Sequence, residues 1–282
     1  MIVKLKTTLL LCLVLCAFAV RAQEKSPVDP DEISDVLERA KAKGKLVACA
    51  DPYAFPYSAQ NTDPPGFDIE IIRNIAKRAG LRTEIYWQDT GTRGGTARAF
   101  RNSIFKKRCD VFLGLSDNGD DDLLMGKLTF TDPYIGLGYV LVVQGKADSM
   151  KTLDELKGAG VKVGVPMSTP IDDYLFMREI SRGLYADNRR IMQGMANGEV
   201  DAGFVWATNV SLAKAEFPTA TFHMVAGYIP QPDHRWNSKF AVRKEDQSML
   251  QFINDGIKGL LSDGTMQKII ESYGVPFYAP FP

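Results

Sequence analysis

Histidine is scarce in this sequence, and the motifs that mark common enzyme classes are missing. The histidines are His223 and His234, and there is no Gly-x-Ser-x-Gly elbow, cysteine–histidine nucleophile pair or zinc-type His/Cys spacing. The glycines of Gly91–Gly95 fit neither GxGxxG nor Walker A. We therefore expect a non-enzymatic protein with no catalytic residue, cofactor or metal. The enzymatic alternative is a dehydratase-like use of a carboxylate such as Asp117 as acid or base.

Long apolar runs are confined to the N-terminus. Lys4 and Lys6 precede the apolar run Leu9–Val20, which is too short to span a bilayer, and small residues then allow cleavage after Ala22. Residues 1–22 are thus predicted to be a signal peptide that directs the chain to the periplasm, with an uncleaved anchor as the alternative. Cys16 lacks the small residue before it that a lipoprotein signal needs, so we expect no stable membrane anchor.

The chain also lacks an excess of charge of either sign. It has 34 basic and 34 acidic residues, and loss of the leader with its three basic residues would leave a net charge of about −3. This balance argues against nucleic acid or an anionic membrane as a partner. The basic run Lys106–Arg108, with Arg98 and Arg101 upstream, is interpreted as the solvated face of a helix. Docking of an acidic partner is the alternative.

Two cysteines, Cys49 and Cys109, remain after the leader. A lone pair in an oxidising compartment is usually a disulfide. Cys49 lies late in one predicted strand and Cys109 just before another, so parallel strands in simple register would place the α-carbons beyond the limit of about 7 Å. A disulfide and two buried thiols both remain open.

Strand and helix patterns alternate along the chain, after a first amphipathic helix expected at Asp31–Lys43. Strands are expected at Lys45–Ala50, Arg82–Trp87, Asp110–Leu115, Tyr139–Val143, Lys162–Val165, Ala202–Val205 and Lys239–Val242, and helices at Phe67–Ala79, Ala97–Lys107, Thr152–Leu156, Asp172–Arg182, Arg190–Asn197, Gln247–Ser262 and Thr265–Ser272.

This alternation predicts an α/β protein with parallel sheets in two lobes. Crossings near Gly138–Gly145 and His234–Lys244 would form a hinge beside a ligand cleft. The expected division is a first lobe at 23–140, a second lobe at 141–238 and a return to the first lobe at 239–282.

Six short motifs, in order, resemble the family 3 solute-binding proteins over nearly the whole mature chain. They are Phe55-Pro56-Tyr57-Ser58, Gly66-Phe67-Asp68, Cys109-Asp110-Val111, Phe130-Thr131-Asp132-Pro133-Tyr134, Gly198–Ala202 and Gly264-Thr265. The resemblance implies the type II periplasmic binding protein fold, in which two βαβ lobes are joined by a double-crossover hinge.

The chain departs from the amino-acid receptors of that family at two charged positions. The arginine that grips the ligand carboxylate is replaced by the acidic segment Asp117–Asp122, and the aspartate that pairs with the amino group is replaced near Trp206. Because a buried ammonium and carboxylate both need partners, the ligand is expected to be something other than a free amino acid.

Four segments resemble the binding proteins associated with quinoprotein dehydrogenases: Val47–Pro52, Arg108–Val111, Val205-Trp206 and Tyr273–Pro276. That resemblance implies an accessory protein whose partner is a PQQ-dependent methanol dehydrogenase, and a Cys49–Cys109 pair fits it. This is the favoured interpretation. The alternative is a receptor that delivers a small organic ligand to an ABC importer.

The candidate ligand-binding residues follow predicted strands or open a helix. Loops at the carboxyl ends of parallel strands face the cleft, and the helix expected after Pro170 would offer its N-terminus there. For the aromatic residues the alternative is core or lip packing, and for Ser168 and Thr169 it is helix capping alone. The candidates are Tyr53, Phe55, Tyr57, Trp87, Ser116, Asp117, Tyr134, Ser168, Thr169 and Trp206.

The acidic segment Asp117–Asp122 could bind a hard cation through its carboxylates. It lacks the spacing of an EF-hand loop, so a solvated turn is the expected structure.

Overall fold

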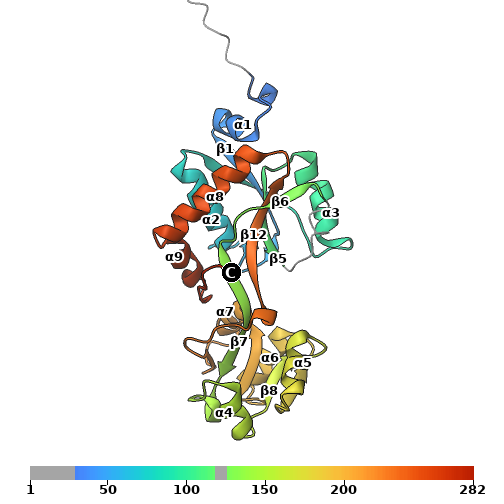
Figure 1. Cartoon of the computed structure of the whole chain (residues 1–282), viewed down its shortest axis with the longest axis vertical. Helices are drawn as coiled ribbons and strands as arrows, with labels where there is room; N and C mark the ends of the chain where they lie inside the picture. The colour runs from blue at the N-terminus through green and yellow to red at the C-terminus, as the bar shows by residue number, and fades with distance from the viewer. Residues whose placement is uncertain (1–28, 118–125) are drawn as a thin grey trace, which may run out of the picture.

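The computed structural model describes residues 29–117 and 126–282 (Figure 1). The predicted signal peptide and residues 118–122 of the acidic segment lie outside the described residues. Within the described part, no helix is both long and apolar enough to cross a membrane.

Figure 1 shows two groups of elements, one above the other, which we call the first and second lobes. The first lobe contains α1 (Val36–Lys43), β1 (Lys45–Ala50), the small strands β2 (Tyr53–Ala54) and β3 (Ser58–Ala59), α2 (Phe67–Arg78), β4 (Arg82–Trp87), α3 (Gly95–Asn102), β5 (Val111–Asp117), β6 (Leu128–Phe130), α8 (Gln247–Ser262) and α9 (Thr265–Ser272).

The second lobe contains α4 (Leu153–Gly158), β8 (Val163–Pro166), α5 (Pro170–Met177), β9 (Arg182–Tyr185), α6 (Asn188–Ala196), β10 (Ala202–Trp206), α7 (Ala207–Glu216) and β11 (His223–Met224). Short 3-10 turns lie at Pro30–Glu32, Ile104–Lys106, Gly145–Ala147 and Pro232–His234.

Two long strands, β7 (Ile135–Val143) and β12 (Arg235–Arg243), run through both lobes (Figure 1). They make one continuous sheet in the order β4-β1-β5-β12-β7-β10-β8-β9. Each strand changes partner partway: β7 pairs with β12 over Ile135–Gly138 and with β10 from Tyr139 onward. The predicted boundaries after residues 140 and 238 fall inside these strands, and the division of the chain there stays a prediction.

The sequence explains where the first elements begin and end. The side chain of Asp35 accepts a hydrogen bond from the Glu38 amide, and Gly44 closes α1 in the left-handed region at φ 62°. The chain before Asp35 forms a short 3-10 turn, so the helix begins later than the predicted Asp31. Gly66 precedes α2 at φ 112°, where a Cβ would lie 2.4 Å from the Tyr57 carbonyl oxygen, so the turn requires glycine.

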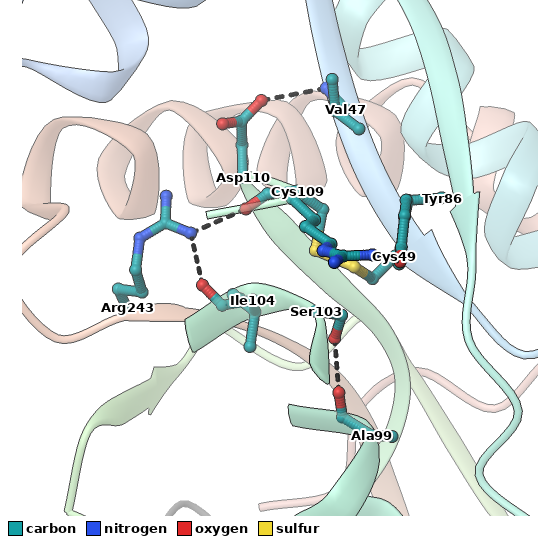
Figure 2. The surroundings of a disulfide bond; sticks show 10 residues. Val47, Cys49, Tyr86, Ala99, Ser103, Ile104, Cys109, Asp110 and Arg243 are labelled. Atoms are coloured by element: carbon teal, nitrogen blue, oxygen red, sulfur yellow. Dashed lines mark hydrogen bonds between the residues drawn. A yellow bond between two sulfur atoms is a disulfide. The ribbon is translucent and has the colours of Figure 1, made fainter. Parts of the chain in front are cut away.

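Cys49 and Cys109 form a disulfide, with α-carbons 5.6 Å apart (Figure 2). The register pairs Cys49 with Phe112, so a straight extension of β5 would carry Cys109 away from it. However, β5 begins only at Val111, and the chain before it bends toward β1. The two sulfurs therefore meet in a small buried cluster with Phe100 and Phe112.

Candidate ligand-binding cavity

A cavity of about 310 Å³ lies at the carboxyl ends of β1 and β5, where the first lobe faces Trp206 of the second. Its lining combines apolar side chains, hydroxyl groups and one carboxylate, without an arginine or lysine. The lining residues are Asp51, Ala54, Tyr57, Ser58, Thr90, Thr96, Phe112, Leu113, Gly114, Leu115, Ser116 and Trp206. Ligands of open α/β sheets bind at this end of the strands.

Trp206 spans the two lobes. It ends β10, and its Nε1 donates a hydrogen bond to the Tyr57 hydroxyl at 3.0 Å. Burial of the Tyr57 side chain raises its pKa to about 12, since the phenolate would be poorly solvated there. Tyr57 is therefore neutral at physiological pH and can both accept this bond and donate one.

Aromatic neighbours fix the orientation of the Trp206 indole. Its ring centroid lies 5.6 Å from that of Tyr139 in an edge-on arrangement and 5.4 Å from that of Trp236. The Trp206 amide donates to Asn188 Oδ1 at 3.1 Å. The indole is thus a preorganised wall of the cavity, held by both crossing strands and α6.

The carboxylate of Asp51 is occupied by neighbouring groups. Its Oδ1 accepts from the Tyr53 amide at 2.7 Å, and its Oδ2 accepts from the amide of Thr90 at 2.7 Å and from the Thr90 hydroxyl. Ser58 Oγ donates to the Asp51 carbonyl at 2.7 Å. Asp51 thus ties together the loops after β1 and β4. In contrast, no hydrogen bond between described residues uses the hydroxyls of Thr96 or Ser116, which leaves them to face a ligand.

A buried acid lies behind the cavity. Asp68, on α2, is fully buried, and its Oδ1 accepts a hydrogen bond from the Tyr134 hydroxyl at 2.5 Å. Its Oδ2 has no hydrogen-bond partner among the described residues. Burial raises the pKa of Asp68 to about 8, and the bond from Tyr134 opposes that rise. The carboxyl is therefore largely protonated at neutral pH.

The predicted ligand-binding residues divide into two sets. Tyr57, Ser116 and Trp206 line the cavity. Tyr53, Phe55 and Trp87 do not: Tyr53 is 80% exposed, Phe55 packs against Tyr273, and Trp87 packs against the largest hydrophobic cluster described.

The other candidates also lie off the cavity lining. Tyr134 is fully buried with Asp68, and Asp117 forms an ion pair with Lys239. Thr169 caps α5 by accepting from the Asp172 amide at 3.3 Å, and the Asp172 carboxylate accepts from the Ser168 amide at 3.0 Å, as in the alternative of helix capping.

Several lining residues were missed from sequence, although a signal existed for some. Asp51 directly follows β1, so the rule that selected Tyr53 selects it as well. Thr90 and Thr96 flank Gly91–Gly95, a stretch tested only as a phosphate loop. Gly114 gave no sequence signal. Among the described residues, no group of three or more His, Cys, Asp or Glu side chains could hold a metal ion.

Comparison with known proteins agrees with this architecture. The L-cystine solute receptor of Neisseria gonorrhoeae, in an unliganded open conformation, superposes with a TM-score of 0.71 at 18% identity and covers 87% of this chain and 99% of that one. The molecule is thus a type II periplasmic binding protein in fold, which confirms the prediction. The model for bacterial extracellular solute-binding proteins, family 3, matches residues 45–276, and the chain belongs to that family.

Curated relatives extend the comparison. The L-cystine-binding protein TcyJ of Escherichia coli is 29% identical over 245 residues, which cover 84% of this chain and 85% of the relative. A probable amino-acid ABC transporter-binding protein of Haemophilus influenzae is 33% identical over 131 residues, 45% of this chain and 46% of that protein.

Proposed function

We propose that this chain is a non-catalytic periplasmic receptor that captures a small organic molecule other than a free amino acid and delivers it to an ABC importer. Membership of the solute-binding family supports the receptor role. The relative named as an ABC transporter-binding protein supports the importer. The periplasmic location rests on the predicted leader.

The composition of the cavity wall is the observation that supports the proposed class of ligand. A zwitterionic amino acid enclosed in a water-poor cleft needs a cation beside its carboxylate, because burying an unpaired carboxylate costs several kcal/mol. No arginine or lysine lines the cavity, and the Asp51 oxygens are already engaged by Tyr53 and Thr90. The wall offers instead Trp206, apolar β5 side chains and the hydroxyls of Thr96 and Ser116. Such a wall suits an uncharged molecule with a flat or apolar face and hydroxyl or carbonyl groups.

Capture would use closure of the two lobes around β7 and β12. In this proposal residues 23–140 and 239–282 form one lobe and 141–238 the other, and Trp206 brings the second lobe onto the ligand. The change of pairing partner within β7 and β12 supports a hinge there.

Calorimetry and thermal shift on the mature protein test the ligand class. We expect no binding heat with L-cystine or L-histidine, and stabilisation by members of a panel of uncharged alcohols, amides and aromatic ketones. Thr96→Val should weaken the binding of any hit, whereas Thr92→Val, outside the lining, should not. Tight binding of L-cystine would overturn the proposed class while leaving the receptor role intact.

A second candidate is the accessory role with a PQQ-dependent methanol dehydrogenase. The observation that favours it is the disulfide, which joins two of the four segments that carry the resemblance, Val47–Pro52 and Arg108–Val111. The relatives named above do not support it. Sedimentation of the mature protein with purified quinoprotein methanol dehydrogenase distinguishes the two: a stable complex favours the accessory role, and independent sedimentation favours the receptor.

A further inference from the structure

A rigid basic turn projects from the first lobe at the end away from the cavity. We call Lys106–Arg108 the basic turn; all three residues are exposed. It precedes β5, whose other end lines the cavity. None of the three residues lines the cavity: they lie before the amino end of β5, whereas the cavity lies at the carboxyl ends of β1 and β5. The proposed ligand binding therefore does not account for the turn.

Two anchors, Arg243 and the disulfide, hold the backbone on either side of the turn (Figure 2). Arg243 is buried, and its Nη1 donates to the carbonyls of Ile104 at 3.0 Å and Cys109 at 2.7 Å. The disulfide ties the far end of the turn to Cys49 of β1. Lys107 lies between these anchors at φ 56°, a left-handed conformation that non-glycine residues adopt at a cost.

Arg243 is itself held by the buried carboxylate of Asp246. Its Nε lies 2.6 Å from Asp246 Oδ2, although the two atoms are not aligned as a hydrogen bond, so the contact is an ion pair. Ser103 Oγ donates to the Ala99 carbonyl at 2.7 Å and closes α3 just before the turn (Figure 2). An exposed loop with this many internal anchors holds its backbone in one conformation.

Two cavities flank the turn and share Lys107. One, of about 480 Å³, has the Phe105 ring in its wall together with Lys127 and Lys244. The other, of about 430 Å³, is lined by Arg39, Lys45 and Arg108 among others.

Few acids offset these cations. From Thr90 to Cys109 the sequence contains no Asp or Glu. In the second cavity, Asp31 is paired with Lys43, Lys45 is paired with Glu84 at 2.7 Å, and Asp110 accepts from the Val47 amide at 3.0 Å. Glu245 lies in the first cavity. No ion pair between described residues involves Lys106, Lys107 or Arg108, so within the described part of the chain the turn presents three unpaired positive charges.

We propose that the basic turn and its two flanking cavities dock an acidic segment on the surface of a partner protein. The cations lie on both sides of Lys107, an arrangement that suits an extended run of carboxylates better than one small anion. The Phe105 ring gives one cavity an apolar surface for a side chain between the acids. Rigid presentation reduces the ordering cost of binding, and complementary charge speeds association and sets its register.

Fluorescence anisotropy with a labelled deca-glutamate peptide tests the surface on the whole mature protein. We expect binding that weakens steeply with salt and falls at least about tenfold in Lys106→Glu/Lys107→Glu/Arg108→Glu. The matched control, Lys214→Glu/Lys258→Glu/Lys268→Glu, makes the same change of charge on exposed positions of α7, α8 and α9 and should bind as the wild type does.

A second variant tests the surface without changing Lys107, because a substitution at this left-handed position could itself destabilise the fold. Lys106→Ser/Arg108→Ser leaves the left-handed residue in place and should still weaken binding severalfold, with an unchanged melting temperature. The proposal fails if the wild type does not bind the peptide, or if both triple variants lose affinity equally, because net charge alone would then be responsible. Binding to phosphatidylglycerol vesicles but not to the peptide would also overturn it in favour of a lipid surface.

Discussion

Trp206 of β10 donates a hydrogen bond to the hydroxyl of Tyr57, and this 3.0 Å contact joins the second lobe to the loop between β2 and β3 of the first. Trp206 lines the cavity near the position where the resemblance to amino-acid receptors implied an aspartate. One side chain therefore both shapes the proposed site and connects the lobes that would close on a ligand.

A double-mutant cycle measures this contact. Tyr57→Phe and Trp206→Phe each remove one partner, and the coupling between them in urea unfolding should be about 1 kcal/mol, the usual net contribution of a hydrogen bond. The control cycle uses Tyr53→Phe with Trp206→Phe. Because Tyr53 is exposed and off the cavity lining, its coupling should be close to zero. Equal coupling in both cycles would contradict a specific contact.

The buried acid Asp68 predicts an inverse dependence of stability on pH. Its pKa is raised to about 8 by burial, whereas an unfolded chain has an Asp pKa of about 3.9. The folded protein therefore binds more protons than the unfolded chain between these values. From this group alone, the free energy of unfolding falls as pH rises from about 4 to about 8 and then levels off.

Asp68→Asn isolates this contribution because the amide does not titrate and can still accept from Tyr134. Urea unfolding of the wild type and the variant across this pH range should show the wild type losing stability relative to the variant as pH rises. Asp173→Asn, at an exposed position of α5, is the control and should run parallel to the wild type. Parallel curves for Asp68→Asn would show that Asp68 is ionised throughout.

Sequence patterns predicted the alternation of elements better than the details of the site. Strong periodicity and capping residues placed α2, α8 and α9 close to their observed bounds. The strand β9 was missed because Arg182–Tyr185 is short and follows a helical pattern, and α7 was missed because Ala207–Glu216 has little contrast between its faces. In both cases tertiary packing fixes what local preference leaves open.

The cavity was only partly predictable for a similar reason. Trp206 was predicted correctly to line the cavity because it ends a strand that points to the cleft. Tyr134, the last residue of the family-like segment Phe130–Tyr134, instead lies buried against Asp68. Gly114 of β5 and Thr96 of α3 are far apart in sequence, and only the folded chain brings both to the lining of one cavity. The disulfide could not be settled from spacing, since the bend before β5 that brings Cys109 to Cys49 has no local sequence signal.

Loss of the disulfide should destabilise the first lobe. The bond closes a loop between residues 60 positions apart, and removal of such a bond costs about 2–5 kcal/mol, mainly because the unfolded chain gains freedom. Cys49→Ala/Cys109→Ala should therefore unfold at lower urea concentration. Both cysteines are buried, so dithiothreitol should act slowly on the native wild type. Rapid reduction without denaturant would indicate that the bond is more accessible than the structure shows.

Gly114, the glycine in the cavity lining, should be difficult to replace. It lies in β5 at φ 71°, and an added Cβ would lie 3.1 Å from Oδ2 of the buried Asp68. Gly114→Ala therefore combines left-handed strain of about 1–2 kcal/mol with a close contact that the buried carboxyl cannot easily relieve.

Gly44→Ala provides the matched control for this substitution. Gly44 has a similar φ of 62° at the end of α1, but no atom lies within 4 Å of its added Cβ. Urea unfolding should show a loss of about 1 kcal/mol for Gly44→Ala and a clearly larger loss for Gly114→Ala. If the two losses are equal, backbone strain alone accounts for Gly114, and the approach of Asp68 to the cavity wall has no energetic consequence.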